Sequence, residues 1–312
     1  KNKYMELGPR DKLSQAFWHE QRAGRTGKFG DSDVVYLDLR HLGKDYLHER
    51  LPFICELAKS YVNVDPVTQP IPVRPAVHYT MGGITTDAQC ETKIKGLYAA
   101  GECASVGLHG ANRLGSNSLT ELLVFGRLAG EQAVKNALTR DQSPSAPLAE
   151  QFQAQQQKLA ALRTHTGQES WVEIKRALLK TMEEGCGIYR DQAGMEQTLA
   201  TIRQLKLRYQ DVQVQDKSRG YNTELLQCIE VGFGLDIAEA TCLAALERRE
   251  SRGAHQRLDE GCDTRNDTDY LQHSLVYFHT NNDATLAWQP VDTSILPPAV
   301  RAYGDAAKGA KL

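Results

Sequence analysis

The sequence predicts a mixed fold, in which an α/β segment precedes a domain built mainly from helices. Two observations predict the α/β segment: a short apolar stretch at 96–100 ends at a glycine, and a Gly-rich loop then leads into a long amphipathic helix at 117–137. A third observation predicts the helical domain, since apolar residues recur at helical spacing from about 148 to 250. With 312 residues, the chain is long enough for two domains with sizeable cores.

The composition is ordinary for a soluble globular protein, with 41% hydrophobic and 24% charged residues. A net charge of -2 gives no support for a nucleic-acid partner or a strongly basic membrane-binding patch. The longest apolar runs, such as 122–125, are far too short to span a bilayer. The seven cysteines form no Cys-x-x-Cys pair and lack iron–sulfur or zinc spacing, so we expect reduced thiols in a cytoplasmic compartment.

The first 72 residues are expected to mix helix and strand. Leu13, Ala16 and Phe17 share one face of a helix at 11–18. The other elements expected here are a polar loop at 24–32, a strand at 34–39, and a helix at 47–61 with an apolar side of Leu51, Ile54, Leu57 and Ala58. Prolines at 66, 70 and 72 then break the chain.

A proline-containing linker at 143–147 is expected to separate the α/β segment from the helical domain. Ser170 with Glu173 has the form of a capping box, and Asn222 should cap a later helix that runs towards 249. The residues expected to form apolar stripes in the bundle are Leu148, Phe152, Leu159, Leu162, Met195, Leu199, Ile202, Leu205 and Tyr209. The elements expected after the bundle are strands at 271–278 and 286–288 around a turn at 281–283, and then a disordered tail.

The segment 78–123 sets three kinds of chemical group at the ends of regular elements. Glu102 follows the expected strand, Arg113 lies in the Gly-rich loop, and the helix opens at a polar cluster, 116–120. Strand ends, a cation and a helix N-terminus converge where α/β proteins bind anionic ligands or cofactors. The residues of the helix expected to pack on a sheet are Leu119, Leu122, Leu123, Phe125, Leu128 and Ala129.

This segment resembles the flavoprotein subunits of fumarate reductases and succinate dehydrogenases. The motifs that carry the resemblance are His-Tyr-Thr-Met-Gly-Gly at 78–83, Gly-Glu-Cys at 101–103, Gly-Ala-Asn-Arg at 110–113, Gly-Pro-Arg-Asp at 8–11 and Glu-Ser-Arg-Gly-Ala-His at 250–255. The first two are most similar to the quinol-linked bacterial fumarate reductases, whereas L-aspartate oxidase shares the third. The resemblance implies an α/β flavin-binding segment plus a helical bundle domain, the C-terminal part of an FAD-dependent fumarate reductase flavoprotein fold.

The dinucleotide-binding fingerprint Gly-x-Gly-x-x-Gly is not found in the sequence, nor is a P-loop, and Gly24, Gly27 and Gly30 have the wrong spacing. The family carries that fingerprint and its covalent flavin-linking histidine nearer the N-terminus, so we expect the chain to begin inside the capping domain. The domains expected are part of the capping domain at 1–72, the end of the FAD-binding domain at 73–142, a helical bundle at 143–256, and a hairpin with a tail at 257–312.

The resemblance implies reduction of fumarate to succinate by hydride transfer from FAD, with electrons delivered from quinol through an iron–sulfur subunit. It also implies membrane anchor subunits and a peripheral position at the cytoplasmic face of the bacterial inner membrane. Three alternatives stay open: succinate dehydrogenase running the reverse reaction, L-aspartate oxidase, and a non-catalytic helical fragment that binds no flavin. Activity on aspartate would test the second alternative, and the flavin colour of the purified protein would test the third.

Three residues are candidates for the substrate site. The planar fork of Arg113 can grip a carboxylate bidentately, although a loop arginine is as often in a surface ion pair. A lone histidine such as His78 is more often structural than functional, and Arg10 could simply pair with Asp11 at a helix start. The resemblance implies that Arg113 and His78 bind the substrate carboxylates and that Arg10 delivers the proton.

The resemblance further implies that Glu102, Ser118 and Leu119 contact the FAD. The N-terminus of the helix at 117–137 offers free N–H groups and about +0.5 of an elementary charge, which suits an electron-rich ligand edge. The polar run at 250–255 is interpreted as a structural ion-pair cluster that ties the helical domain to the α/β segment, in preference to a catalytic group. No metal site is expected.

Overall fold

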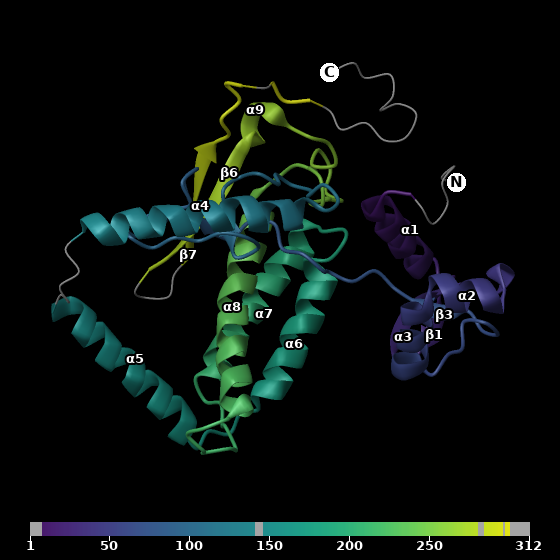
Figure 1. The fold of residues 1–312 in the computed structure, drawn as a ribbon, viewed down its shortest axis with the longest axis horizontal. Coiled ribbons are helices and arrows are strands. Elements are labelled where there is room, and N and C mark those ends of the chain that lie inside the picture. The colour runs from purple at the N-terminus through teal and green to yellow at the C-terminus, as the bar shows by residue number, and fades with distance from the viewer. Residues whose placement is uncertain (1–7, 141–145, 280–283, 296, 300–312) are drawn as a thin grey trace. The chain divides into compact units, whose positions relative to one another are not determined.

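The computed structural model describes residues 8–140, 146–279, 284–295 and 297–299. The chain forms two compact units, which divide between His78 and Tyr79 (Figure 1). The described part of the first unit therefore ends where the motif at 78–83 begins, and the rest of the motif belongs to the second unit.

The first unit contains a three-stranded antiparallel sheet in the order β1–β2–β3. Its elements are α1 (Arg10–Arg22), β1 (Gly27–Phe29), β2 (Ser32–Leu37), η2 (Arg40–Leu42), α2 (Lys44–Arg50), α3 (Pro52–Val62) and β3 (Ile71–Val73). Phe17, Val34 and Leu47 are buried and contribute to its core. The helix expected at 11–18 and the strand expected near 34–39 are confirmed, with the bounds shifted by a few residues.

Two expectations for this unit are wrong. The helix expected at 47–61 is two helices, because Pro52 begins α3 and disfavours helical backbone at Leu51, where φ is -130°. The polar loop expected at 24–32 contains β1, which places Gly27 opposite Val34. The connection from β1 to β2 needs Gly30, whose φ of 56° lies in the left-handed region.

The α/β part of the second unit is small. β4 (Ile84–Thr85) pairs in parallel with β5 (Ala104–Ser105), and α4 (Asn117–Thr139) confirms the expected long helix. The strand expected at 96–100 is wrong, since Tyr98 forms only an isolated bridge to Glu91. Gly96, with φ of 86°, turns the chain just before this stretch, and the described residues offer it no continuous partner strand.

Half of the apolar face expected on α4 is exposed, whereas Phe125, Leu128 and Ala129 are half-buried. Leu119, Leu122 and Leu123 have relative exposures of 65%, 47% and 77%, whereas Glu121 is only 3% exposed. The expectation that the whole of this face packs on a sheet is therefore wrong for this structure. The physical reason is size, because two strands of two residues each cannot cover a helix of 23 residues.

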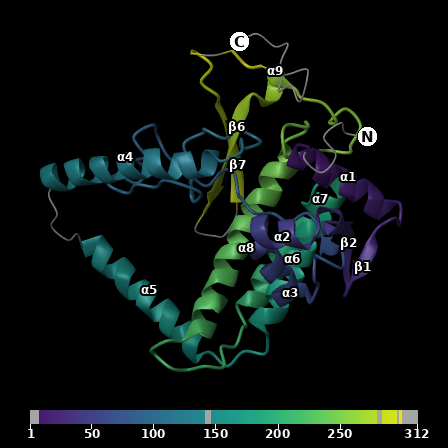
Figure 2. The same cartoon turned by 45° about the vertical axis from the view of Figure 1, so that its right-hand side comes forward.

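The centre of the second unit is a helical bundle in which α6, α7 and α8 lie side by side (Figures 1 and 2). Its helices are α5 (Ala146–Thr164), α6 (Trp171–Gly185), α7 (Gln192–Tyr209) and α8 (Thr223–Glu247). The stripe expected on α7 is confirmed, since Met195, Leu199, Ile202 and Leu205 are buried in the core and Tyr209 packs against it. On α5 the stripe is mostly exposed, and of its members Leu162 packs against that core.

Both expected helix caps are present. The Ser170 hydroxyl accepts the Glu173 N–H at 3.4 Å, and the Asn222 side-chain oxygen accepts the Leu225 N–H at 2.7 Å. Such caps replace hydrogen bonds that the first helical turn cannot make.

A hairpin follows the bundle, as expected. α9 (Asp267–Tyr270) leads into β6 (Gln272–Phe278), which pairs antiparallel with β7 (Ala284–Pro290). The expected turn at 281–283 and the expected tail beyond 299 lie outside the described residues. In the described part of the chain, no helix combines the length and the apolar character that crossing a bilayer requires.

Candidate functional site

A short segment, 79–81, contacts two of the candidate residues of the second unit, Glu102 and Arg113. The Thr80 N–H donates to the Glu102 carboxylate at 2.8 Å, and the Arg113 N–H donates to the Met81 sulfur at 3.0 Å. Tyr79 donates its hydroxyl to the Glu121 carboxylate of α4 at 3.0 Å. Three adjacent residues thus join the turn before β5, the Gly-rich loop and α4 to one another.

Arg113 lies with its guanidinium over the Tyr79 ring, 4.5 Å from the ring centroid. The same side chain donates from Nη1 to the Leu114 carbonyl at 2.9 Å. The residue is half-buried rather than fully solvated. Cation–π contact of this kind holds the charge while leaving the planar fork able to meet a carboxylate.

Arg113 lies on a largely buried polar cluster of Tyr79, His109 and Glu121. This cluster was not predicted from the sequence. His109 Nε2 lies 2.6 Å from a Glu121 carboxylate oxygen and 3.1 Å from the Tyr79 hydroxyl. Burial and the hydrogen bond to Glu121 raise the pKa of Tyr79 to about 12, so its hydroxyl stays protonated and donates. One signal was present in the sequence: Glu121 stands among leucines on α4, where a charge needs a partner.

The N-terminus of α4 carries no side-chain cap. Ser116 precedes the helix in the left-handed region, with φ of 64°, and its side chain caps no N–H. The Leu119 N–H returns to the Ser116 carbonyl at 3.0 Å. Ser118 is half-buried and the Leu119 side chain is exposed at this end. A helix start without a cap presents donors and partial positive charge, which fits an anionic or electron-rich group such as the edge of a flavin.

Glycines let the backbone approach closely beside this helix start. Gly83 has φ of 139°, and a Cβ there would lie 2.5 Å from the Cys103 carbonyl oxygen. Gly101, with φ of 80°, precedes Glu102, which is exposed and accepts the Thr80 N–H. A carboxylate can accept from the hydroxyls of a flavin dinucleotide, and an uncapped helix start can face its ring edge. Glycines let the backbone come close to such a ligand.

The loop that carries Arg113 is tied to the polar run at 250–255. The Ala254 N–H donates to the Ala111 carbonyl at 2.8 Å. At Gly253, φ is +58° and a Cβ would lie 2.4 Å from the Ala111 oxygen, so any other residue would push the two loops apart. This contact places the helical domain against the substrate-site candidate.

Glu250 is the centre of that polar run and is fully buried. It accepts from Arg248 at 2.8 Å, from Arg252 at 2.7 Å and from the Asn266 N–H at 2.8 Å. Burial alone would raise the pKa of Glu250, but these hydrogen bonds, that of Arg252 foremost, keep it below its ordinary value. The geometry supports the interpretation of 250–255 as a structural ion-pair cluster.

His255 completes the cluster in its neutral form. Its Nδ1 lies 3.0 Å from Arg190 Nη1, and its Nε2 lies 3.0 Å from the Arg248 carbonyl, so Nδ1 accepts and Nε2–H donates. Burial, and next the charge of Arg190, lower the pKa of His255 to about 4. A neutral imidazole held at both nitrogens is a structural group here.

Arg10 and His78 belong to the first unit. Arg10 is the first residue of α1 and is exposed, and His78 is exposed and directly precedes Tyr79 in the chain. Their meeting with Arg113 at one substrate stays a prediction. Glu102 and Arg113, in contrast, both contact the segment 79–81. Ser118 and Leu119 lie in the first turn of α4, the helix whose Glu121 accepts the hydrogen bond from Tyr79.

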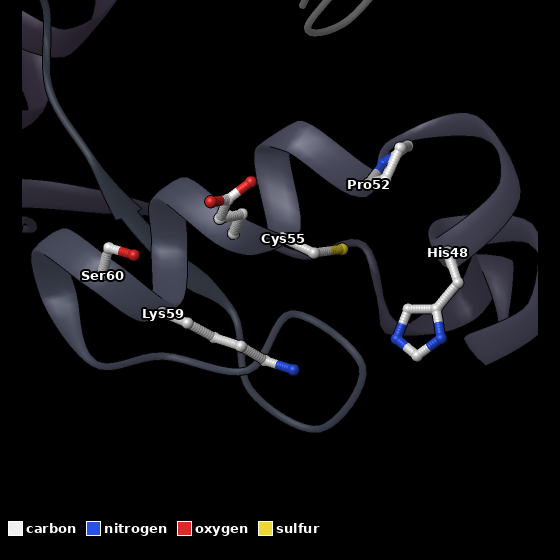
Figure 3. A pocket seen from close by; sticks show the side chains of 6 residues that line it. His48, Pro52, Cys55, Lys59 and Ser60 are labelled. Carbon is white, nitrogen blue, oxygen red and sulfur yellow. The ribbon is translucent and has the colours of Figure 1, made fainter.

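A separate surface hollow of about 330 Å³ lies in the first unit (Figure 3). The residues that line it are His48, Pro52, Cys55, Glu56, Lys59 and Ser60. Lys59 already pairs with Asp65 at 3.1 Å, and the Cys55 thiol donates to the Leu47 carbonyl. The hollow contains none of the predicted site residues. Across the described ranges, no group of three or more His, Cys, Asp or Glu side chains could hold a metal ion.

Comparison with known proteins gives two family matches. The family described as "FAD binding domain" matches residues 2–119, and the family described as "Fumarate reductase flavoprotein C-term" matches residues 175–303. The first therefore includes every predicted site residue, and the second takes in most of the bundle and the hairpin.

Two relatives and one solved structure agree with these matches. The fumarate reductase flavoprotein subunit of Escherichia coli K12 is 56% identical over 310 residues, which are 99% of this chain and 52% of the relative. The succinate dehydrogenase flavoprotein subunit of Rickettsia bellii is 36% identical over 316 residues, covering 96% of this chain and 52% of the relative. A solved structure of a mutant E. coli quinol fumarate reductase superposes with a TM-score of 0.92 at 56% identity, over 98% of this chain and 52% of that one.

The chain spans about half the length of the curated relatives that it matches. Within that span the motifs, the fold and the bundle agree with one family from end to end. This chain belongs to the fumarate reductase and succinate dehydrogenase flavoprotein family, and it carries part of the FAD-binding domain together with the C-terminal domain.

Proposed function

We propose that the protein reduces fumarate to succinate as the flavoprotein subunit of a quinol-linked fumarate reductase. The observation that carries the proposal is the Arg113 fork, stacked on Tyr79 and joined through 79–81 to Glu102 and to the uncapped start of α4. A carboxylate-binding cation thus lies on the same framework as a helix start suited to a flavin.

The substrate is a planar dianion, which needs a cation or strong donor at each carboxylate. Arg113 can hold one carboxylate with two parallel N–H bonds, and His78 can donate a hydrogen bond to the other. FAD, when bound, supplies the hydride, because no amino-acid side chain does so. Glu102 can accept from cofactor hydroxyls, while the start of α4 at Ser118 and Leu119 can present its partial positive charge to an electron-rich edge.

Arg10 is proposed as the group that delivers the proton to the alkene carbon opposite the hydride. An arginine is almost always protonated, so after donating it must regain its proton through neighbouring acidic groups. Its position as the exposed first residue of α1 leaves it accessible to such a relay.

The electrons are proposed to come from quinol through an iron–sulfur subunit, with membrane anchor subunits completing the complex at the cytoplasmic face of the bacterial inner membrane. The described part of this chain has neither a metal-binding cluster nor a helix able to cross a membrane. The relative of known structure is named as a quinol fumarate reductase.

Succinate oxidation is the second candidate function. The relative from Rickettsia bellii is named as a succinate dehydrogenase flavoprotein subunit. Substrate and hydride geometry are the same for the two directions, so the direction depends on the potentials of flavin and quinone. The ratio of fumarate reduction to succinate oxidation in the assembled complex measures it.

Substitution of Arg113 tests the proposal. In the complete enzyme, Arg113→Lys keeps the charge but loses the planar fork, so we expect kcat/KM for fumarate to fall by roughly 2–4 kcal/mol of transition-state stabilisation. Flavin content, measured by absorbance of the purified complex, should stay near normal. Parent kinetics in this variant would show that Arg113 does not bind the substrate.

A further inference from the structure

We propose that Tyr79, fixed by Glu121 and His109, is a positioning residue that holds the Arg113 guanidinium in place to receive a substrate carboxylate. The inference rests on the proposed function, since it deepens the role given to Arg113. It gives a role to Tyr79, Glu121 and His109, none of which is among the site residues predicted from the sequence.

The first step is the contact between Tyr79 and Arg113. The guanidinium carbon lies 4.5 Å from the centre of the Tyr79 ring. A ring face attracts the cation without accepting the in-plane N–H groups that a carboxylate needs. A long arginine side chain otherwise samples many rotamers, and restricting them before binding lowers the entropy lost on binding.

The second step is the fixation of the ring itself. Its hydroxyl donates to Glu121 at 3.0 Å, and His109 lies edge-on to it, with ring centroids 5.6 Å apart at 83°. Glu121 and His109 are joined at 2.6 Å, and their side chains are only 3% and 8% exposed. A ring held at its hydroxyl and against its edge cannot swing away from Arg113 without breaking a buried hydrogen bond.

The third step connects the ring to the cofactor framework. Glu121 lies on α4, one helical turn after the uncapped start at Asn117, and the neighbouring Thr80 N–H is held by Glu102. The helix that would face the flavin therefore also fixes the position of the Tyr79 ring. Arg113 and the helix start are coupled through Glu121, so the substrate carboxylate and the cofactor edge are placed by one rigid element.

A purely structural role for this cluster predicts something different. A buried carboxylate with two donors stabilises the fold by satisfying its own charge, whatever Arg113 does. Substitution would then lower the melting temperature without changing how dicarboxylates bind. The two roles separate when binding is measured on folded protein.

The test uses the complete, flavin-loaded complex and malonate, a dicarboxylate that does not react. We expect Tyr79→Leu to weaken malonate binding by about 5–30-fold and to raise KM for fumarate by a similar factor, with kcat within a few-fold of the parent, because the cation–π contact is lost. Tyr79→Phe keeps the ring and loses only its anchor, so we expect a smaller loss, about 2–5-fold, and the same direction for Glu121→Gln. Flavin absorbance perturbation by malonate reports the dissociation constant.

Tyr209→Phe is the matched control. The Tyr209 hydroxyl also donates a partly buried hydrogen bond, to the Cys228 carbonyl at 2.8 Å, but it lies in the helical bundle. This variant should lose thermal stability and keep the parent malonate affinity. If the Tyr79 and Glu121 variants behave in the same way as Tyr209→Phe, the cluster is structural and the inference is overturned.

Arg113→Ala separates failure of this inference from failure of the proposed function. If Arg113→Ala leaves malonate affinity unchanged, the proposed role of Arg113 is wrong. If it abolishes binding while Tyr79→Leu has no effect, only the positioning role is wrong. Added guanidinium chloride should partly restore malonate binding to Arg113→Ala, and we expect that rescue to be several-fold weaker in Arg113→Ala/Tyr79→Leu; equal rescue in both would also overturn the inference.

Discussion

Helices α7 and α4 present similar apolar patterns but meet opposite environments. On α7, Met195 and Ile202 are fully buried in the bundle core, whereas on α4 the residues Leu122 and Leu123 are 47% and 77% exposed. The position of α4 that is buried is a charge, Glu121. Periodicity therefore predicts that a helix has an apolar face, but the burial of that face depends on what the rest of the fold places against it.

The two regions are also stabilised by different kinds of interaction. The bundle is stabilised by apolar area removed from water, at about 25 cal/mol per Å². The loops around α4 are held instead by directed polar contacts, such as those of Glu121 and Glu250. Directed contacts fix orientation more strictly than apolar packing, which suits a site that must aim a guanidinium.

Removing the Glu250 charge should have the largest effect on stability. Glu250→Gln removes the buried carboxylate that Arg248 and Arg252 share and leaves Arg252 with Asp267. Breaking one side of such a cluster costs about 3–5 kcal/mol. Urea denaturation followed by circular dichroism measures the loss. Glu131→Gln on α4 is the control, because Glu131 makes a solvent-exposed pair with Arg127 at 2.8 Å, and its loss should leave the midpoint unchanged. Equal midpoints for both variants would contradict the assignment of Glu250 as a structural centre.

Truncation in the bundle core should come next. Ile202 is 0% exposed, so Ile202→Ala removes buried methylene groups and leaves a cavity, with an expected loss of about 2–5 kcal/mol. The unfolding midpoint in urea measures it, and the slope should not change. A loss below about 1 kcal/mol would mean that the α7 stripe is packed far less tightly than its burial indicates.

Lowering the pH should reduce the free energy of unfolding through His255, which lies in the segment after α8. Its folded pKa of about 4 lies below the ordinary 6.5, so the group is neutral when folded and gains a proton on unfolding. Its stabilisation is complete above pH 6.5 and is lost as the pH falls towards 4, which amounts to about 2 kcal/mol between pH 7 and pH 5. Unfolding free energies at the two pH values measure this. Burial also lowers the pKa of His273, so His255→Gln should flatten the pH dependence without abolishing it.

Truncation on the exposed face of α4 should have the smallest effect. Leu123→Ala removes a side chain that is 77% exposed and replaces it with a better helix former, so stability should change by less than about 0.5 kcal/mol. The same urea experiment compares it directly with Ile202→Ala. A loss as large as that of the core variant would show that α4 is covered in solution and would remove the contrast between the two helices.

The sequence by itself determined the elements that depend on neighbouring residues. The α7 stripe, the caps at Ser170 and Asn222, and the β6–β7 hairpin follow from local spacing and side-chain chemistry, and all are confirmed. The motif around Arg113 and Glu102 could also be found in the sequence, because both residues lie within three residues of a glycine in one short segment. Local backbone preferences and short-range hydrogen bonds suffice for such features.

Only the tertiary structure decided the features that join distant segments. The stretch at 96–100 is no strand because a strand needs a partner, and the described chain provides only the bridge to Glu91. Tyr79, His109 and Glu121 come from three separate segments, and nothing in their spacing says that they meet. The cost of leaving a charge buried in apolar surroundings requires that Glu121 have partners, but the fold chooses which residues they are, and that choice gives Arg113 its support.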